Sequence, residues 1–457
     1  MLNSMSADAS KLGLLVRHPI FLIAIAGIAI RFVIFPFLEV GYDSDFWATI
    51  IGNIEAGEGL YGLEGYYYTP VWGYVLSFLS FIQESLLNID VMGLRVPEAF
   101  PIEVAKGWYL SATVTSISFN VSVKTLLLIF DLIAGYLIYW LIKDKTGDMR
   151  KATIGFALWF LCPLVICITS VSGMFDSLSV IFTLLCIIMI RKDNLFLGGV
   201  LFSFAVLTKF FPAYLVFILI AYILVKHRGD GKALVSVFKM AAGAFLAFVV
   251  IMLPQIIQGD LAESFLFATT RATSEDGMIS MAAVAYLAGI AAALILGYNL
   301  FKKNKEELDD PFFISILLMV AVLFLYPPLP QYTVLLIPFL VISITTISTK
   351  LKWSWLMTSI GGAGIVFGSN LALLLSFGTF TGLISTEYIA SVVCWLQTPI
   401  FTDLSPMSIF YSIPGTIQYA GIISVLLFFI IEERKRRKRG FPVWPFGLLN
   451  YQEEKQS

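Results

Sequence analysis

Long apolar stretches recur along the whole chain and limit its fold more than any other feature. Most are about 16 to 25 residues long, too long and too uninterrupted for the core helices of a soluble domain. Only 13% of the 457 residues are charged, against roughly a quarter in soluble domains. We therefore predict an all-α polytopic membrane protein with about twelve transmembrane helices and exclude a soluble globular fold. The twelve runs lie near residues 18–38, 119–142, 152–170, 175–190, 195–208, 210–225, 233–257, 279–300, 311–326, 332–348, 353–375 and 413–431.

The basic residues indicate how these runs are oriented. If the N-terminus is cytoplasmic, 24 of the 30 Lys and Arg residues fall on the cytoplasmic side, as positive-inside bias requires. The agreement holds only if the 13-residue apolar stretch 70–82 stays on the outer side, as an interfacial or re-entrant segment. Both termini are then cytoplasmic. The formal net charge of −1 provides no basic face for nucleic acid.

This topology predicts where the functional chemistry lies. One long outer segment, 39–118, carries interfacial helices, and shorter outer loops cover 258–278 and 376–412. We divide the chain into a main transmembrane module, 1–350, C-terminal transmembrane helices, 351–431, and a basic cytoplasmic tail, 432–457. The four cysteines are scattered without CxxC spacing and are expected to be packing residues.

Two acids, Asp43 and Asp45, follow the first apolar run directly in the segment Gly41-Tyr42-Asp43-Ser44-Asp45. In an extended segment, side chains two residues apart point the same way, so both carboxylates are expected to face one cleft. Such a pair can act as a general base or hold a divalent cation, Mg²⁺ or Mn²⁺. Both histidines fall on the cytoplasmic side, which favours a carboxylate as any outer base.

Basic residues are scarce on the outer side, and they are candidates for binding a phosphate at the lipid headgroup level. Lys209 lies between two short apolar runs, and Arg271 lies in the second outer loop. The alternative is that Lys209 extends toward the headgroups and that Arg271 pairs with a nearby acid. Arg31 and Asp131 lie within apolar runs. They form either a structural pair or part of the active site.

Several polar and aromatic residues near the outer ends of the runs are candidate substrate contacts. Asp176 begins a run and either caps its helix or contacts a substrate hydroxyl. Tyr68 belongs to an aromatic cluster that is expected to anchor at the membrane interface, with sugar stacking as the alternative. Gln331 and Tyr332 follow the prolines of a tight outer hairpin, where Gln331 can point its amide into the cleft.

Taken in order, these landmarks resemble the GT-C superfamily of membrane glycosyltransferases, which use polyprenyl-phosphate-linked sugars. The nearest likeness is to the catalytic subunit of GPI mannosyltransferase I and its prokaryotic relatives. The likeness covers roughly residues 20–340 and departs from the family at Cys162, where Asn is common, and at the apparent insertion 85–118. The landmarks are Asp43-Ser44-Asp45, Gly59-Leu60-Tyr61, Tyr66 to Pro70 with Trp72, Phe130-Asp131-Leu132, Cys162-Pro163-Leu164, Gly173 to Ser177, Leu207 to Pro212 and Pro330-Gln331-Tyr332.

The resemblance implies inverting transfer of a sugar, in the first instance mannose, from a polyprenyl (dolichyl-type) phosphate donor to a lipid, glycan or protein hydroxyl at the outer face. Asp43 or Asp45 would be the base, and Asp45 fits the family spacing better. Lys209, Arg271 and Arg31 would bind the donor phosphate. The enzyme would reside in the plasma membrane of a prokaryote or the endoplasmic reticulum membrane of a eukaryote, with or without an accessory membrane subunit.

Two other functions stay open at this stage. Twelve spans with both termini inside is also a common plan of secondary transporters, although these usually have two matching halves and binding residues at the midplane. A non-catalytic subunit of a glycosyltransferase complex would keep the fold, and it would be free to lose the acidic pair. The sequence retains both Asp43 and Asp45.

Overall fold

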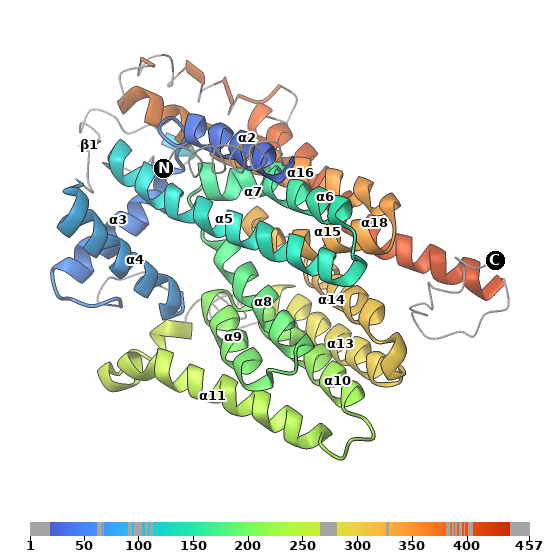
Figure 1. Ribbon diagram of the computed structural model, residues 1–457. Coiled ribbons are helices and arrows are strands. Elements are labelled where there is room, and N and C mark those ends of the chain that lie inside the picture. The colour runs from blue at the N-terminus through green and yellow to red at the C-terminus, as the bar shows by residue number, and fades with distance from the viewer. Residues whose placement is uncertain are drawn as a thin grey trace, which may run out of the picture.

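The structure is a computed structural model in which helices dominate. It describes residues 19–61, 66, 68–89, 94–95, 103–105, 108–109, 113–265, 281–325, 329–380, 384–385, 388, 391–392, 395–396, 398–400 and 405–438. Figure 1 shows the helices gathered into one bundle, with α3 (Gly41–Glu55) and α4 (Pro70–Ile82) at one end of it.

Each predicted apolar run is a helix or a broken helix, so the sequence located these elements correctly. Three runs are broken: α6 and α7 share one, and short 3-10 helices, Phe211–Leu215 and Pro330–Leu335, precede α10 and α15 in the other two. The helices are α2 (Pro19–Ile34), α5 (Ile117–Thr146), α6 (Met149–Phe160), α7 (Pro163–Ile166), α8 (Asp176–Arg191), α9 (Leu195–Thr208), α10 (Val216–Lys226), α11 (Ala233–Gln258), α13 (Met281–Phe301), α14 (Asp309–Leu323), α15 (Leu336–Thr346), α16 (Lys352–Phe380) and α18 (Pro406–Lys438).

Fewer helices are long enough to cross a membrane than the runs predicted. Among the described residues, four are both long and apolar enough: Ile117–Thr146, Ala233–Gln258, Ala283–Phe301 and Pro406–Lys435. A fifth is present if the bent pair Met149–Phe160 and Pro163–Val171 counts as one span. These helices indicate a membrane protein, and the full count of twelve crossings stays a prediction.

The outer segment 39–118 contains the helices α3 and α4, and a π-helical turn, Gln83–Leu87, that continues α4. It also contains four strands of two or three residues, which the all-α prediction did not include. β1 (Leu94–Arg95) pairs antiparallel with β4 (Thr113–Val114), and β2 (Glu103–Ala105) pairs antiparallel with β3 (Trp108–Tyr109).

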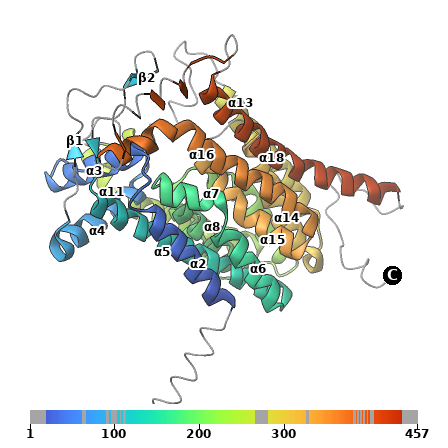
Figure 2. The same cartoon turned by 90° about the horizontal axis from the view of Figure 1, so that it is seen from above.

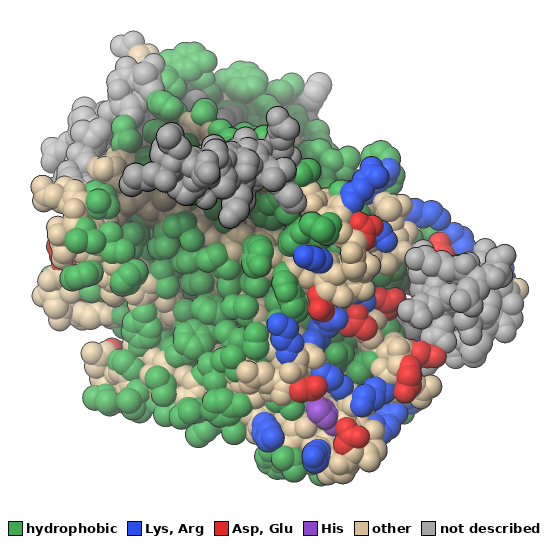
Figure 3. All heavy atoms as spheres, in the orientation of Figure 1, with side chains coloured by type: hydrophobic (Ala, Val, Ile, Leu, Met, Phe, Trp, Pro, Cys, Tyr) green, Lys and Arg blue, Asp and Glu red, His purple; other side chains and the backbone are tan. Residues whose placement is uncertain are grey.

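Charged side chains collect at one end of the molecule, beyond a broad hydrophobic surface (Figure 3). Ion pairs join several helix ends there: Lys145 Nζ lies 2.5 Å from Asp309 Oδ2, Arg191 Nε lies 3.1 Å from Asp309 Oδ1, and Lys226 Nζ lies 2.8 Å from Asp193 Oδ1. The charge distribution predicted that these connections share one side of the membrane. Their contacts agree with that grouping, and which side is cytoplasmic stays a prediction.

Close backbone packing explains two glycines at helix crossings. A Cβ atom on Gly199 of α9 would lie 1.9 Å from the carbonyl oxygen of Met240 on α11, and one on Gly243 would lie 2.0 Å from that of Phe196. Only glycine fits at such approaches, as in other membrane helix pairs. Near the C-terminal end of the chain, α16 and α18 run side by side (Figure 2).

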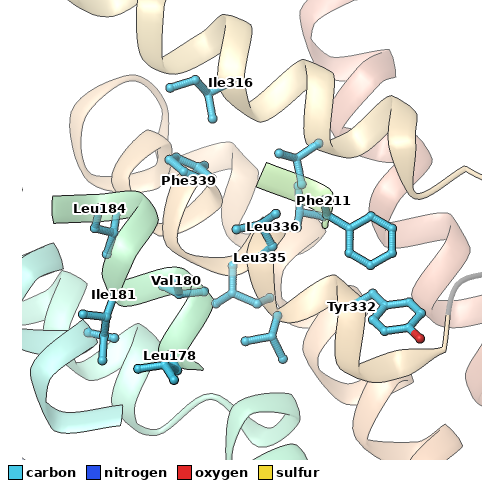
Figure 4. Packing of buried hydrophobic residues seen from close by; sticks show 14 of the residues in the cluster. Leu178, Val180, Ile181, Leu184, Phe211, Ile316, Tyr332, Leu335, Leu336 and Phe339 are labelled. Carbon is cyan, nitrogen blue, oxygen red and sulfur yellow. The ribbon is translucent and has the colours of Figure 1, made fainter. Parts of the chain in front are cut away.

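The apolar core reaches the end of the bundle that carries α3 and α4. In Figure 4, Phe211 and Tyr332 lie next to each other beyond the aliphatic residues of α8, α14 and α15. Their ring centroids are 4.7 Å apart. These two rings mark the point where apolar packing gives way to buried charge.

Candidate functional site

Asp43 and Asp45 lie on a helix, which corrects the expectation of an extended segment. Both residues belong to α3, with Asp43 in its first turn. A helix turns by about 100° per residue, so side chains two apart point in directions about 200° apart. The two carboxylates therefore do not face one cleft together, and each has to be considered by itself.

Lys209 and Asp176 form a buried ion pair. Lys209 Nζ lies 3.5 Å from Asp176 Oδ1, and each side chain is only 6% exposed. Lys209 thus points into the protein, and the expectation that it extends to the lipid headgroups does not hold. Asp176 is the first residue of α8, and no side-chain hydrogen bond caps that helix. Its carboxylate serves the ion pair.

Three aromatic rings surround the Lys209 ammonium. Nζ lies 4.4 Å from the ring centroid of Phe175, 4.9 Å from that of Tyr68 and 5.3 Å from that of Tyr332. Ring faces attract a cation while keeping water away from it. The rings come from three separate parts of the chain, and we call this arrangement of Lys209, Phe175, Tyr68 and Tyr332 the lysine cage.

Local backbone geometry fixes the two charged residues of the pair. α9 ends at Thr208, and Lys209 follows in an extended conformation, with φ −145° and ψ 134°. Pro212 then starts the next short helix, because its ring fits the first turn. On the other side, Gly173 adopts φ +69° just before α8, a conformation that favours glycine. Lys209 therefore lies in a short extended link between two helices, and Asp176 follows a turn at Gly173.

Asp43 is the third charged group of the site. Both Lys209 and Asp176 act electrostatically on its carboxylate. Burial raises the pKa of Asp43, the positive charge of Lys209 lowers it, and the negative charge of Asp176 raises it; together these effects bring the pKa to about 7. A carboxylate with a pKa near neutrality can accept a proton and release it under physiological conditions.

An aromatic cluster holds α3, α4 and the start of α8 together. Trp47 Nε1 donates a hydrogen bond to the Gly173 carbonyl oxygen over 3.1 Å. The rings of Trp72 and Phe175 stack with centroids 4.6 Å apart and planes 8° apart. Tyr68 is only 7% exposed, which corrects its expected role as an interface anchor. The cluster is an internal support for the lysine cage.

Arg31 and Asp131 form a second buried pair, one of the two arrangements that the sequence allowed. Arg31 Nη2 lies 2.9 Å from Asp131 Oδ2, and both side chains are 0% exposed. Thr169 donates to Oδ2 over 2.9 Å, and Ser177 donates to Oδ1 over 2.6 Å. The Arg31 guanidinium also lies 4.3 Å from the ring centroid of Phe160. Its described contacts are thus all within the protein.

The remaining predicted site residues are placed as follows. Gln331 is half-buried beside Tyr332. The side chain of Thr49 donates to the backbone carbonyl of Asp45 over 2.8 Å. Arg271 lies outside the described residues, so its predicted role in phosphate binding stays a prediction.

A metal site does not emerge from the described part of the chain. The described residues contain no group of three or more His, Cys, Asp or Glu side chains placed to hold a metal ion. Because Asp43 and Asp45 diverge on α3, the pair does not form the two-carboxylate clamp that the sequence suggested. We therefore derive no chemical step through a cation. Cys162, Cys167 and Cys186 are free and buried, as expected for packing residues.

Sequence reasoning missed Phe175 and Trp47. Phe175 precedes Asp176 directly, and this position of an aromatic residue next to an acid was the one sequence signal that could have identified it.

A scan against models of known protein families gives no match, and a search of curated proteins gives none either. The functional argument therefore depends on the site itself.

Proposed function

We propose that this chain is an inverting membrane glycosyltransferase that moves a sugar from a polyprenyl phosphate donor to a hydroxyl acceptor. One observation carries the proposal: the buried Lys209 cation, 3.5 Å from Asp176 and surrounded by three rings, acts electrostatically on the carboxylate of Asp43. Transfer from a phosphate carrier needs both, since a cation has to stabilise the departing phosphate and a base has to take the acceptor proton.

The location of the site supports a lipid-linked donor. α8 begins at Asp176 and ends at Arg191 in the charged end of the molecule. The two ends of this 16-residue helix are about 22 Å apart at about 1.5 Å per residue, a large part of a bilayer core. A polyprenyl phosphate in that bilayer would present its phosphate at the headgroup plane opposite the charged end.

The proposed reaction is a single displacement. Asp43 takes the proton of the acceptor hydroxyl, and the hydroxyl oxygen attacks the anomeric carbon of the donor sugar. The bond from that carbon to the phosphate oxygen breaks, and the electron pair leaves with the polyprenyl phosphate. Lys209 stabilises the new negative charge. Attack from the face opposite the leaving group inverts the anomeric configuration.

Asp43 replaces Asp45 as the favoured base in this proposal. The pKa of Asp43 responds to Lys209 and Asp176, whereas the family spacing had favoured Asp45. Mannose as the sugar and Arg271 as a second phosphate ligand follow from the family resemblance alone. A divalent cation would need ligands other than the Asp43 and Asp45 pair.

The test compares Asp43→Asn with the matched variant Asp45→Asn. Purified protein is incubated with mannosyl or glucosyl polyprenyl phosphate and a panel of lipid, glycan and peptide acceptors, and transfer is measured. Asp43→Asn should lower the rate by about 10²- to 10⁴-fold, the usual contribution of a general base. Asp45→Asn should lower it much less.

Size-exclusion profiles and unfolding temperatures of both variants provide the folding control. Transfer by Asp43→Asn at the wild-type rate would remove Asp43 as the base. Absence of transfer by the wild-type protein, with every donor and acceptor supplied, would count against the glycosyltransferase proposal itself.

A further inference from the structure

A separate group of buried polar side chains lies behind α3, in the connection from α2. Glu39 and Lys124 are each only 1% exposed. Neither touches the lysine cage in any described contact, and neither has a role in the reaction above. Buried charges are costly unless they are compensated, so their presence needs an explanation.

Lys124 is a residue of α5 and fixes the connection between α2 and α3. Its ammonium donates to the backbone carbonyl oxygens of Phe35, over 3.4 Å, and of Leu38. The side chain of Asn120, one turn earlier on α5, donates to the Phe35 carbonyl over 3.0 Å. These carbonyls follow the last turn of α2, where backbone acceptors lack helical partners. Residues 35–40 are thereby held against α5.

Glu39 links the same connection to α3. The Thr115 hydroxyl donates to Glu39 Oε1 over 2.5 Å. The positive charge of Lys124 and the hydroxyl of Ser44 both act on the Glu39 carboxylate and lower its pKa, against a larger increase caused by burial. Ser44 is itself a buried residue of α3 and adjoins Asp43 in the chain. Val40, the residue after Glu39, accepts backbone hydrogen bonds from Asp43 over 3.0 Å and from Ser44 over 3.2 Å. The connection that contains Glu39 thus continues directly into the turn that carries the proposed base.

We propose that Glu39 and Lys124 are positioning residues that lock the first turn of α3 and so hold Asp43 toward Lys209. Other contacts of α3 lie further along the helix, among them the hydrogen bond from Trp47 to Gly173. That bond lies one turn further along the helix. Without Glu39 and Lys124, the first turn would keep its helical bonds and lose its fixed direction.

The inference rests on the proposed function only for its kinetic readout, and backbone hydrogen exchange tests it independently. The variants are Glu39→Gln, Lys124→Met and the double variant. Lys145→Met is the matched control, because Lys145 is also a lysine of α5 but lies at the charged end, where its Nζ atom is 2.5 Å from Asp309.

Glu39→Gln leaves the buried ammonium of Lys124 without a nearby negative charge, and Lys124→Met leaves the buried carboxylate of Glu39 without a nearby positive charge. Exchange at residues 43–55 should therefore become about 10- to 100-fold faster, with α8 and α11 unchanged. The double variant should be less affected than the sum of the two singles, since removing both charges leaves neither uncompensated. Lys145→Met should leave exchange in α3 unchanged.

A milder variant keeps the test decisive if the charge variants fold poorly. Thr115→Val keeps the side-chain shape and removes one hydrogen bond to Glu39, so exchange in α3 should rise about two- to tenfold. Unchanged exchange in α3, or an equal increase in α8 and α11, would overturn the positioning role.

Kinetics provide the second readout. In Glu39→Gln, kcat should fall while KM for the lipid donor stays unchanged, because the lysine cage is intact and only the direction of the base is lost. A rise in donor KM with unchanged kcat would contradict the proposal. If the wild-type protein transferred no sugar, the proposed function would fail while the exchange result for α3 would still stand or fall by itself.

Discussion

The two buried ion pairs of this protein differ in how completely they are satisfied. Asp131 receives hydrogen bonds from Arg31, Thr169 and Ser177. Asp176 lies 3.5 Å from Lys209, and its Oδ2 atom has no hydrogen-bond partner among the described residues. A saturated pair has no capacity left for a ligand, whereas an incompletely satisfied pair can exchange its partner. The first pair therefore holds helices together, and the second is suited to chemistry.

The two cations, Arg31 and Lys209, also differ in the kind of group that surrounds them. The Arg31 guanidinium is fixed by Asp131 and by the Gly27 carbonyl oxygen at 3.2 Å. The Lys209 ammonium faces the rings of the lysine cage, which attract it without saturating its charge. Three predictions test this contrast, beginning with the largest expected effect.

Arg31→Met should destabilise the protein most. It leaves the Asp131 carboxylate buried without its cation, which costs about 3 to 5 kcal/mol. The measurement is the unfolding temperature and the yield of monodisperse protein in detergent. Asp131→Leu combined with Arg31→Met should recover part of the loss, because both charges are then absent. A single Arg31→Met variant as stable as wild type would show that the saturated pair is not a structural clamp.

The pH dependence of transfer should respond to the second pair. Asp43 acts as a base only when ionised, so kcat/KM should rise with pH through about 7, the pKa of its carboxyl group. Lys209→Met removes the positive charge that lowers this pKa and should move the midpoint upward. Asp176→Asn removes the negative charge that raises it and should move the midpoint downward.

These shifts are measured from pH profiles of kcat/KM between pH 5 and 9, about two units on either side of the midpoint. Asp309→Asn, at the charged end of the molecule, is the control and should leave the midpoint unchanged. Equal midpoints in wild type, Lys209→Met and Asp176→Asn would show that the pair does not influence the titrating group, and would contradict the proposed site.

The smallest expected effect comes from the rings of the lysine cage. Tyr68→Leu or Tyr332→Leu removes one ring face, which contributes about 0.5 to 1 kcal/mol to the position of the ammonium. KM for the lipid donor should rise about two- to fivefold. Tyr222→Leu is the control, since its ring lies 6.0 Å from Lys226 at the charged end. An unchanged KM in both cage variants would show that the rings pack the protein interior without influencing donor binding.

The sequence predicted the helices well because long apolar runs have few alternatives in a membrane. It also allowed the Arg31–Asp131 pair, since two ionisable groups within apolar runs need partners. It did not predict that residues 41–55 form a helix. Asp43-Ser44-Asp45 has no strong helical pattern of its own, and the hydrogen bond from Trp47 to Gly173 that holds α3 comes from a distant part of the chain.

The lysine cage was beyond prediction for a similar reason. Lys209, Tyr68 and Tyr332 were each candidates, but their meeting depends on the ends of α4, α9 and α15 reaching one point. No spacing within a single segment encodes that meeting. Phe175 was overlooked because an aromatic residue next to a helix start usually indicates packing.

Consecutive residues of α8 connect the two ion pairs. Ser177 donates to Asp131 over 2.6 Å, and Asp176 pairs with Lys209 over 3.5 Å. The proposed site is therefore attached to the Arg31–Asp131 pair through Ser177, a contact that does not involve the Asp176 side chain. Substitutions at 176 and 209 should leave that structural pair in place, which makes these two positions the first choice for altering the proposed site.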